Sequence, residues 1–494
     1  MIVVDDPDDW PLEIDGVRVV TGERYIADPE FQSTDPRQLK LFNCCRSYRY
    51  QSTGYYVSLL AEARGHKPLP GVTTIQDLKN RSILRIGAED LDDLIQRSLK
   101  RIKSDELTLS IYFGRNHAKR YDALARRLHQ LFPAPFLRAR FARNESSGRW
   151  LLAWVSPIAM SSIRDEHWPF VEEAARSFFA GKMPHRNRRR FRYDLALLTD
   201  PDAAEPPSDE LALKKFTRAA EALGMRVERI TREDGGRLSE FDALFIRETT
   251  SVQHHTYRFA RRAAAEGLVV IDDPTSIFRC CNKVYLAELL ARHEIAAPRT
   301  MICNRRNLGK VAATLGFPCI LKQPDSSFSQ GVTKVSSEEE LRATAAALFE
   351  RSDLIVAQEN VPTSFDWRIG VLDRQPLYAA RYHMAKDHWQ VIQRDGNGKA
   401  VGLGSVDTLA IADVPPAVVR TALKAANLIG DGLYGVDLKQ VGKRVLVIEV
   451  NDNPNLDAGM EDRVLGSALY QRIAEVFLRR LERLRLPAAM KVGK

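Results

Sequence analysis

The sequence predicts an α/β protein whose C-terminal part is of α+β character. Short strands and helices mix through residues 1–185. Between residues 191 and 274 strands alternate regularly with helices, which indicates a parallel sheet. A strand hairpin at residues 434–455, YGVDLKQVGKRVLVIEVNDNPN, carries acids inside apolar strands, and that pattern indicates a functional site.

The composition is that of an ordinary globular protein. A chain of 494 residues with 44% hydrophobic and 28% charged residues can form roughly two to four domains. No apolar run is long enough to span a bilayer, and the acidic start MIVVDDPDDW lacks the features of a signal peptide. The six cysteines show neither CxxC nor Cys/His metal spacing. We therefore expect a cytoplasmic protein with reduced thiols and no membrane partner.

The net charge of +9 and the pI of about 9.2 favour acidic partners. Five of the arginines form one run, at Arg186, Arg188, Arg189, Arg190 and Arg192. No aromatic RNA-binding motif or DNA-binding helix pattern accompanies them, so the run is a weak indication of nucleic-acid binding. We interpret it as a solvated linker that separates residues 1–185 from the rest of the chain.

Hydrophobic periodicity and the positions of Gly and Pro predict the other elements. In the first domain we expect helices at 56–64, 121–132 and 168–179 and strands at 107–113 and 149–155. The next unit has strands at 194–198, 226–230, 243–246 and 268–271 and helices at 210–223 and 256–266. The remainder has helices at 283–292, 338–349, 416–429 and 465–486 and strands at 318–323, 354–359 and 366–372. Residues 393–405 are rich in Gly, Asp and Asn and are expected to form a mobile loop.

The hairpin offers three oxygen ligands, from Asp437, Glu449 and Asn451. Strand alternation puts Glu449 and Asn451 on one face, together with Val445 and Val447, and leaves residues 446, 448 and 450 on the other. Carboxylate and amide oxygens suit a hard cation such as Mg²⁺. The alternative is that the acids are solvent-exposed on an outward face. Both faces carry apolar residues, however, and buried carboxylates need partners, so we favour a metal site.

The metal site requires Asp437 to face the same side as Glu449. A three-residue loop centred on Gly442 or Lys443 sets these two residues in register. A two-residue turn at Gly442 and Lys443 does not. The sequence therefore predicts the longer loop.

Two lysines and a polar loop predict a phosphate site. A strand that carries Lys322 leads into the Ser- and Gly-containing loop at residues 324–332, which is not a Walker loop. Lys283 opens a helix after Asn282, where the helix dipole disfavours a cation unless an anion binds there. The alternatives are an ordinary loop and an exposed lysine. By contrast, His254, His255, His383 and His388 show no reliable ligand spacing, and we expect surface or hydrogen-bonding roles for them.

Together these elements resemble the ATP-grasp superfamily, most closely its RimK-like branch. The shared order is a lysine after Asn, a second lysine before a Ser/Gly loop, a Gln-Glu hinge, an Asp-x-Arg strand and a final Gly-Val-Asp…Glu-Val-Asn. The resemblance covers residues 190–480. Through SIYFGR, Ser110 to Arg115, residues 1–185 are more weakly similar to the additional N-terminal domain of some RimK-like proteins.

The resemblance implies three domains: an N-terminal domain at 1–185, a pre-ATP-grasp unit at 191–274 and an ATP-grasp domain at 275–486. The last divides into a central lobe at 298–360 and a C-terminal lobe at 361–486. The implied ATP-binding residues are Lys283, Lys322, Ser327, Ser329, Gln330, Gly331, Gln358, Glu359 and Val361. Asp437, Glu449 and Asn451 would hold two Mg²⁺ ions, with Mn²⁺ as the alternative. Lys322, Arg368 and Arg381 would act in catalysis, and Arg247 would reach the site from the preceding unit.

The implied function is an ATP-dependent carboxylate–amine ligase that forms an amide through an acyl phosphate and releases ADP and phosphate. One alternative is an enzyme that adds glutamate or another amino acid to a polypeptide tail. A second is a nucleotide- or nucleic-acid-binding regulator without turnover, which the arginine run suggests. The family often has Ala-Ser-Pro-Gly after Glu-Val-Asn, whereas this chain has residues 452–455, Asp-Asn-Pro-Asn, which concerns the acceptor side. The resemblance also implies self-association, and the identity of both substrates stays open.

Overall fold

A computed structural model describes residues 1–33, 39–78, 91–144, 147–180, 191–325, 331–385, 389–394 and 400–485. The chain forms two compact units, and the division into three domains stays a prediction. Unit 1 comprises Met1–Arg192 with Glu233–Ser239, and unit 2 comprises Tyr193–Arg232 with Glu240–Lys494. All six cysteines are free thiols. Within the described ranges, no helix combines the length and apolar character needed to cross a membrane.

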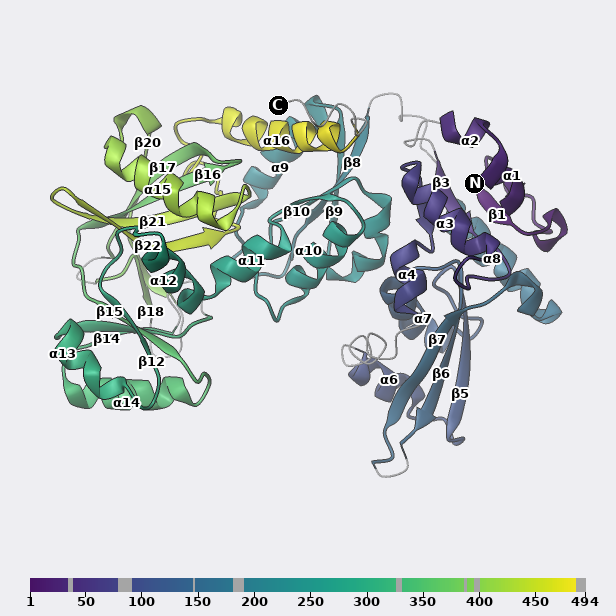
Figure 1. Ribbon diagram of the computed structural model, residues 1–494, viewed down its shortest axis with the longest axis horizontal. Helices are drawn as coiled ribbons and strands as arrows, with labels where there is room; N and C mark the ends of the chain where they lie inside the picture. The colour runs from purple at the N-terminus through teal and green to yellow at the C-terminus, as the bar shows by residue number, and fades with distance from the viewer. Residues whose placement is uncertain are drawn as a thin grey trace. The chain divides into compact units, whose positions relative to one another are not determined.

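Unit 1 contains two sheets (Figure 1). One is parallel, with the order β2-β1-β3-β4, and the other is antiparallel, with the order β5-β6-β7. The strands are β1 Ile2–Val4, β2 Val19–Thr21, β3 Lys40–Asn43, β4 Lys67–Leu69, β5 Glu106–Tyr112, β6 Phe136–Arg143 and β7 Trp150–Pro157. The helices are α1 Gly22–Ala27, α2 Glu30–Ser33, α3 Thr53–Ala63, α4 Val72–Asp77, α6 Asp92–Leu99, α7 Asp122–Leu131 and α8 Trp168–Ala180. The five predicted elements are confirmed as α3, α7, α8, β5 and β7. The parallel sheet was not predicted, because strands of three or four residues are too short to show a period.

Unit 2 begins with the predicted parallel sheet, in the order β11-β10-β8-β9. The strands are β8 Tyr193–Leu198, β9 Met225–Ile230, β10 Ala243–Ile246 and β11 Val269–Ile271, and the helices are α9 Glu210–Ala222, α10 His255–Ala265 and α11 Pro274–Cys281. The last helix of the chain, α16 (Ser467–Arg485), packs on α9 (Figure 1). Phe477 of α16 contacts Phe216 and Phe245, so the C-terminal helix completes the core of this sheet.

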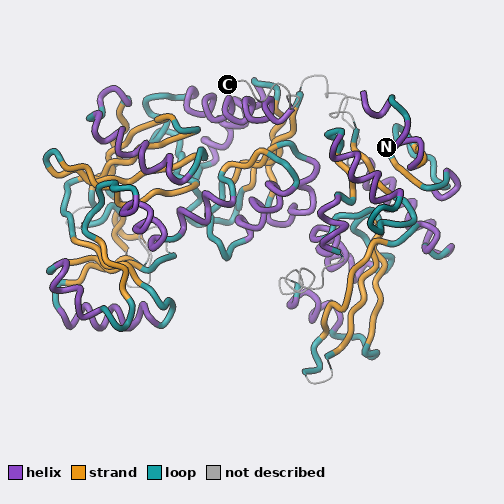
Figure 2. The backbone as a smooth tube through the Cα atoms, viewed as in Figure 1, coloured by secondary structure: helices purple, strands orange, loops and turns teal. Residues whose placement is uncertain are grey.

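Unit 2 also contains two larger antiparallel sheets, whose strands are orange in Figure 2; the division into two lobes stays a prediction. The first has the order β12-β15-β13-β14, from β12 Thr300–Cys303, β13 Cys319–Lys322, β14 Val332–Val335 and β15 Ile355–Glu359, with α13 Val311–Leu315 and α14 Glu338–Phe349. The second has the order β20-β17-β16-β21-β22, from β16 Phe365–Leu372, β17 Gln375–His383, β20 Val406–Leu409, β21 Leu433–Val441 and β22 Arg444–Asp452. Helices α12 Lys283–Arg292 and α15 Pro416–Ile429 pack on the apolar face of the second sheet.

The expectation of a mobile loop at residues 393–405 is wrong in part. Strands β18 (Ile392–Arg394) and β19 (Ala400–Leu403) flank residues 395–399, which lie outside the described part, and they pair as an antiparallel ribbon. Glycine-rich composition predicts turns, but it does not show whether two short segments pair with each other as strands.

The expected three-residue loop in the β21–β22 hairpin is also wrong. Val441 pairs with Arg444, so the turn consists of two residues, Gly442 and Lys443. Gly442 has a φ of 59°, and a type II′ turn requires a positive φ at its first central residue. A register shift follows: Leu438 opposes Val447, whereas Asp437 opposes Glu449. The intervening residue, Ile448, therefore forms a β-bulge.

The bulge corrects the predicted strand faces as well. Val445 and Val447 pack in the same apolar core as Val450, away from Glu449 and Asn451. One extra residue in a strand reverses the alternation beyond it, so the polar face of β22 begins only after the bulge. Asp437 and Glu449 lie opposite each other as predicted, but a β-bulge rather than a longer turn sets this register.

Gly370 provides a test of this packing. A Cβ there would lie 2.2 Å from a ring carbon of Tyr378, which is buried opposite it on β17. The substitution Gly370→Ala should therefore lower the free energy of unfolding by about 1–3 kcal/mol. Gly309→Ala is the control, because a Cβ at Gly309 meets nothing within 4 Å. Denaturant unfolding of both variants checks this, and equal stability of the two would contradict it.

Candidate functional site

Three polar residues of the hairpin meet on one face. Asp437 and Glu449 are direct cross-strand partners. The Asn451 side chain donates a hydrogen bond from Nδ2 to Asp437 Oδ2, at 3.1 Å. This orientation leaves Asn451 Oδ1 as the amide atom that can accept a hydrogen bond or bind a cation.

Arg368 neutralises one of the two acids. On β16 it lies opposite Asp437 and donates two hydrogen bonds to that carboxylate, both 2.7 Å long. Its guanidinium also lies 4.7 Å from the ring centre of Tyr382. Burial disfavours the charge of Arg368, but the Asp437 carboxylate prevails and raises its pKa well above the usual value. The bidentate pair thus fixes the position of Asp437.

A second ion pair on the same face extends the cluster. Lys439 Nζ lies 2.6 Å from Asp366 Oδ1 and donates to Thr363 Oγ1 at 2.7 Å. Asp366 and Arg368 are two residues apart on β16, so both side chains lie on the face that carries the hairpin acids. The Asp-x-Arg motif already indicates that Asp366 and Arg368 share a face. No sequence pattern, however, indicated that Lys439 and Tyr382 lie beside them.

Lys283 neutralises the other acid. It is the first residue of α12, and the Asn282 side chain caps the helix by accepting hydrogen bonds from the next two backbone N–H groups, both 3.0 Å long. Lys283 is only 9% exposed, and its Nζ lies 2.9 Å from Glu449 Oε1. The alternative of an exposed lysine is therefore wrong. Asn282 also donates to Asp325 Oδ1 at 2.9 Å, which joins the helix start to the 324–332 loop.

Among the described charged residues of this cluster, Lys322 has no ion-pair partner. It ends β13, is 8% exposed, and forms no ion pair with any residue that the structure describes. Burial, reinforced by the nearby cations Lys283 and Lys439, lowers the pKa of Lys322 to about 8, although Glu449 opposes the shift. A buried ammonium group of this kind has a strong demand for an anion.

The carboxylates respond differently to burial. Burial raises the pKa of Asp437, despite the opposing effect of Arg368. For Glu449 the same burial is outweighed by Lys283 and Lys322, which together hold its pKa below the usual value. Of these two carboxylates, Glu449 is therefore the more firmly ionised at neutral pH.

A cavity of about 310 Å³ lies beside the two lysines. The Gln358 side chain, which donates to Thr300 Oγ1 at 2.9 Å, lines it together with the bulged Ile448. Its apolar wall comes from Leu286, Leu290, Ile295, Ala297, Ile302, Val356 and Val447. Cations at one end and an apolar wall along the side suit a ligand with a charged group and a flat apolar group.

Other predicted ligand residues lie outside this cavity. Glu359 pairs with Arg299 at 2.7 Å, which holds its pKa below the usual value although burial opposes this. Val361 lies in the connection between β15 and β16, and Gly331 precedes β14, where its carbonyl accepts from the Gln323 N–H at 2.9 Å. Residues Ser327, Ser329 and Gln330 lie outside the described part of the chain. Their binding roles stay predictions.

Arg381 is not brought to the cluster. It opposes Trp367 on the face of the sheet that α15 covers, and its guanidinium lies 5.0 and 4.8 Å from the ring centres of Phe365 and Trp367. Arg368 and Arg381 therefore project from opposite faces. We do not carry Arg381 into the proposed site.

A second network of hydrogen bonds supports the segment after Asn451. Of its residues, only Arg247 was expected from the sequence. Arg247 is buried and donates to Asn453 Oδ1 at 2.6 Å and to the Pro454 carbonyl at 2.8 Å. Asp272 accepts from the N–H groups of Asn453 and Leu433, at 2.6 and 2.8 Å. Burial lowers the pKa of Arg247 to about 10, so it stays protonated at neutral pH. Arg247 thus positions the end of β22 from the parallel-sheet unit.

The donor set of the hairpin fits magnesium. Two carboxylates and one amide oxygen on rigid strands are the hard oxygen ligands that Mg²⁺ prefers, with substrate phosphates and water completing its shell. The carboxylates of Asp437 and Glu449 are held in place by Arg368 and Lys283, which also balance the charge of the acids. We find no such fit for a soft metal, because no cysteine or histidine contacts these three residues in the described structure.

Comparison with known proteins points to one family for both units. The RimK-like ATPgrasp N-terminal domain matches residues 22–174, and the RimK-like ATP-grasp domain matches residues 280–476.

The chain is 29% identical over 194 residues to the alpha-aminoadipate–LysW ligase LysX of Sulfolobus acidocaldarius, covering 37% of this chain and 66% of that protein. It is 26% identical over 230 residues to a probable alpha-L-glutamate ligase of Cellvibrio japonicus, covering 45% of this chain and 72% of that protein. A solved D-alanine–D-alanine ligase from Bacillus anthracis, complexed with ATP, aligns with a TM-score of 0.45 and 15% identity, over 59% of this chain and 98% of that one. The chain spans about two thirds of the length of the first of these relatives.

The two arginines give a matched comparison. Arg368→Lys replaces a bidentate partner of Asp437 by a point charge and should lower ATP-dependent turnover by roughly 10²-fold or more. Arg381→Lys keeps a cation over two aromatic rings on the far face and should leave turnover near the wild-type value. Measured kcat/KM for both variants checks this. Equal losses would place both arginines in the reaction.

The pKa of Lys322 predicts a pH dependence. Phosphate binding needs the ammonium form, so the affinity for ADP should fall as pH rises above about 8, by at most about tenfold per pH unit. Between about pH 8 and 10.4 the unfolded chain binds more protons at this lysine, so stability rises there while affinity falls. Lys322→Arg stays charged and should give a flat affinity profile. Calorimetric titration of ADP across this range tests it, and identical profiles for both proteins would refute it.

Proposed function

Because the chain belongs to the RimK-like ATP-grasp family and carries the additional N-terminal domain of that family, we propose that it joins a carboxylate to an amine with ATP as the energy source. The products are an amide or peptide bond, ADP and phosphate. It is thus an ADP-forming carbon–nitrogen ligase, like the relatives that it resembles.

One observation carries the proposal: Lys283 and Lys322, from separate elements, converge on the acids of the β21–β22 hairpin beside one cavity. The lysines suit the α- and β-phosphates, and Gln358 with the apolar wall suits the adenine. Asp437, Glu449 and Asn451 would hold Mg²⁺, or Mn²⁺ in its place, and we expect two ions. Bound Mg²⁺ would neutralise the charge that builds on the transferred phosphoryl group.

The residues of the chain supply binding, orientation and exclusion of water. A substrate carboxylate attacks the γ-phosphate of ATP, the bond to the β-phosphate oxygen breaks, and ADP leaves. An amine then attacks the carbonyl carbon of the acyl phosphate, phosphate leaves with the bonding pair, and the amine loses a proton. Lys322 and Lys283 stabilise the charge of the phosphates in the first step. We expect the loop at residues 324–332, whose residues 326–330 lie outside the described part of the chain, to cover the reacting groups and limit hydrolysis.

Arg368 steadies the metal ligand Asp437 through Nε and one terminal nitrogen. Its other terminal nitrogen has no partner among the described residues, and we assign it to the acyl phosphate or the substrate carboxylate. Arg247 donates a hydrogen bond to Asn453, which lies where the chain departs from the Ala-Ser-Pro-Gly pattern. We therefore place the acceptor side next to Asn453.

We propose an amino acid as the amine substrate. Two relatives are named for glutamate and for alpha-aminoadipate with LysW, and the basic chain favours acidic partners. The acceptor carboxylate is that of a small molecule, a peptide or a protein tail. The regulator without turnover is the weakest candidate, because the chain carries a complete set of candidate metal and phosphate residues and matches the RimK-like ATP-grasp domain.

An ADP-release screen over amine and carboxylate pairs tests the activity, with the mass of every product measured. Glu449→Ala removes the firmly ionised ligand and should lower ADP release by roughly 10²–10³-fold or more with the fold intact. Far-ultraviolet circular dichroism verifies the fold. Normal turnover of the variant would overturn the metal assignment. A mass increase of a polypeptide incubated with ATP and glutamate identifies a protein acceptor, and release of ADP only with small acceptors excludes it.

A further inference from the structure

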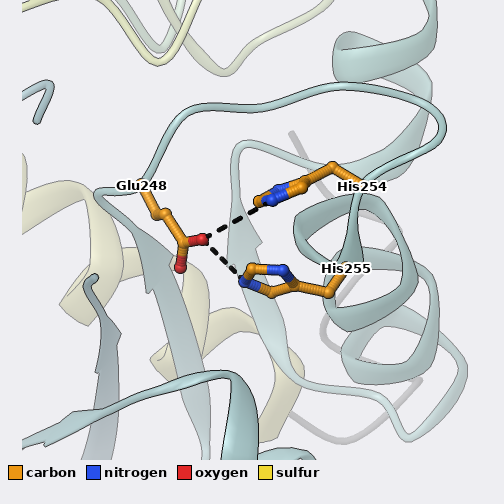
Figure 3. A group of neighbouring side chains, drawn as sticks. All are labelled: Glu248, His254 and His255. Atoms are coloured by element: carbon orange, nitrogen blue, oxygen red, sulfur yellow. Dashed lines mark ion pairs between the residues drawn. The ribbon is translucent and has the colours of Figure 1, made fainter. Parts of the chain in front are cut away.

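A cluster outside the nucleotide site brings together one carboxylate and two imidazoles (Figure 3). Glu248 follows β10 at the carboxyl edge of the parallel sheet, and His254 and His255 stand at the start of α10. Glu248 Oε1 lies 2.7 Å from His255 Nε2 and 3.9 Å from His254 Nε2. Each of the three residues offers one ligand atom, and these three atoms all lie within 4.8 Å of one another.

We propose that Glu248, His254 and His255 form a binding site for one divalent transition-metal ion of the zinc class, separate from the magnesium ligands of the hairpin. Zinc binds imidazole nitrogen and carboxylate oxygen at about 2.0–2.2 Å, so two ligand atoms of a tetrahedral site lie about 3.3–3.6 Å apart. The distances of 2.7 and 3.9 Å from Glu248 Oε1 lie on either side of that separation, so small side-chain rotations would bring the three atoms around one ion. Imidazole favours zinc over magnesium, which prefers oxygen.

The hydrogen bonds of His254 prepare its Nε2 as a metal ligand. The Thr256 hydroxyl donates to the Thr249 carbonyl at 3.4 Å, so Thr256 Oγ1 can accept from His254 Nδ1–H at 3.2 Å. The neutral ring then carries its proton on Nδ1 and directs the lone pair of Nε2 toward Glu248. A carboxylate oxygen and an imidazole lone pair that face each other are a donor pair that suits a divalent cation.

Burial leaves the carboxylate in need of that cation. Glu248 is 3% exposed, and its Oε2 has no hydrogen-bond partner. His255 Nε2 is also buried without a well-aligned hydrogen bond, although it lies close to Oε1. An ordinary Glu–His ion pair would satisfy only one of the two rings. The ring centres of His254 and His255 lie 4.0 Å apart, so a second protonated imidazole would be repelled by the first.

The cluster adjoins the proposed ligase site. The Glu248 carbonyl accepts a hydrogen bond from Asn453 Nδ2 at 2.7 Å. Asn453 follows the metal ligand Asn451 by two residues. Three protein ligands leave a coordination position open, as in zinc sites that bind water or substrate. The ion would therefore lie at the carboxyl edge of the parallel sheet, next to Asn453, where we place the acceptor side.

Zinc binding to the full chain, purified without a polyhistidine tag, tests this site. Calorimetric titration with Zn²⁺ in excess Mg²⁺ should show one tight site per chain in the wild type. His254→Gln and Glu248→Gln should weaken it by at least roughly 10–100-fold. His293→Gln, which removes an exposed histidine elsewhere, should leave it unchanged. Intense visible absorption of bound Co²⁺, lost in His254→Gln, gives an independent signature of imidazole ligation.

Two results would overturn the site: absence of stoichiometric zinc binding by the wild type, or equal affinity in the wild type and both ligand variants. Circular dichroism of each variant guards against unfolding, and His254 is the decisive position because its side chain is 43% exposed and its loss disturbs packing least. If Glu248→Gln unfolds, His254→Gln alone still decides. Neither outcome depends on turnover, so the zinc site stands or falls separately from the ligase activity.

Discussion

Two carboxylates that oppose each other across a hairpin repel, and the site depends on the cations that hold them there. Asp437 and Glu449 are cross-strand partners, an arrangement that is destabilising without compensation. Arg368 compensates one acid and Lys283 the other. The two cations come from a neighbouring strand and from a helix start more than eighty positions apart in the sequence. Assembly of the acids therefore requires the sheet and α12 to be in place together.

The same constraint explains why Lys322 and the cavity lie where they do. With Lys283 engaged by Glu449, Lys322 carries the positive charge without a protein partner in this part of the structure, and the cavity opens beside both. A ligand phosphate would relieve the cost of burying that charge. The network of Arg247, Asp272 and Asn453 extends the support to the parallel sheet, so the end of β22 is fixed from two directions. Positioning of this kind, by residues that do not touch the phosphates, is what a preorganised site needs.

Much of this was readable in the sequence. Helices α12, α14 and α15 begin and end where periodicity and capping placed them, because Asn282, Ser337 and proline mark helix starts clearly. The acids of the hairpin stand out because charge inside an apolar strand is costly. The position predicted for Arg381 was wrong, and the meeting of Glu248 with two histidines was not predicted, for one reason. Which face a side chain occupies, and which distant groups meet it, depends on the register of strands that are far apart in sequence.

The sequence by itself determined the chemical inventory: two lysines, a Gln-Glu hinge, an Asp-x-Arg strand and three oxygen ligands, in an order similar to one family. Tertiary structure alone decided that a bulge at Ile448, rather than a longer turn, brings Asp437 opposite Glu449. It also decided that Arg381 faces α15 and that Glu248 meets two histidines. The physical reason is that local patterns encode propensity and charge, whereas one inserted residue or one strand pairing reverses every side chain that follows it.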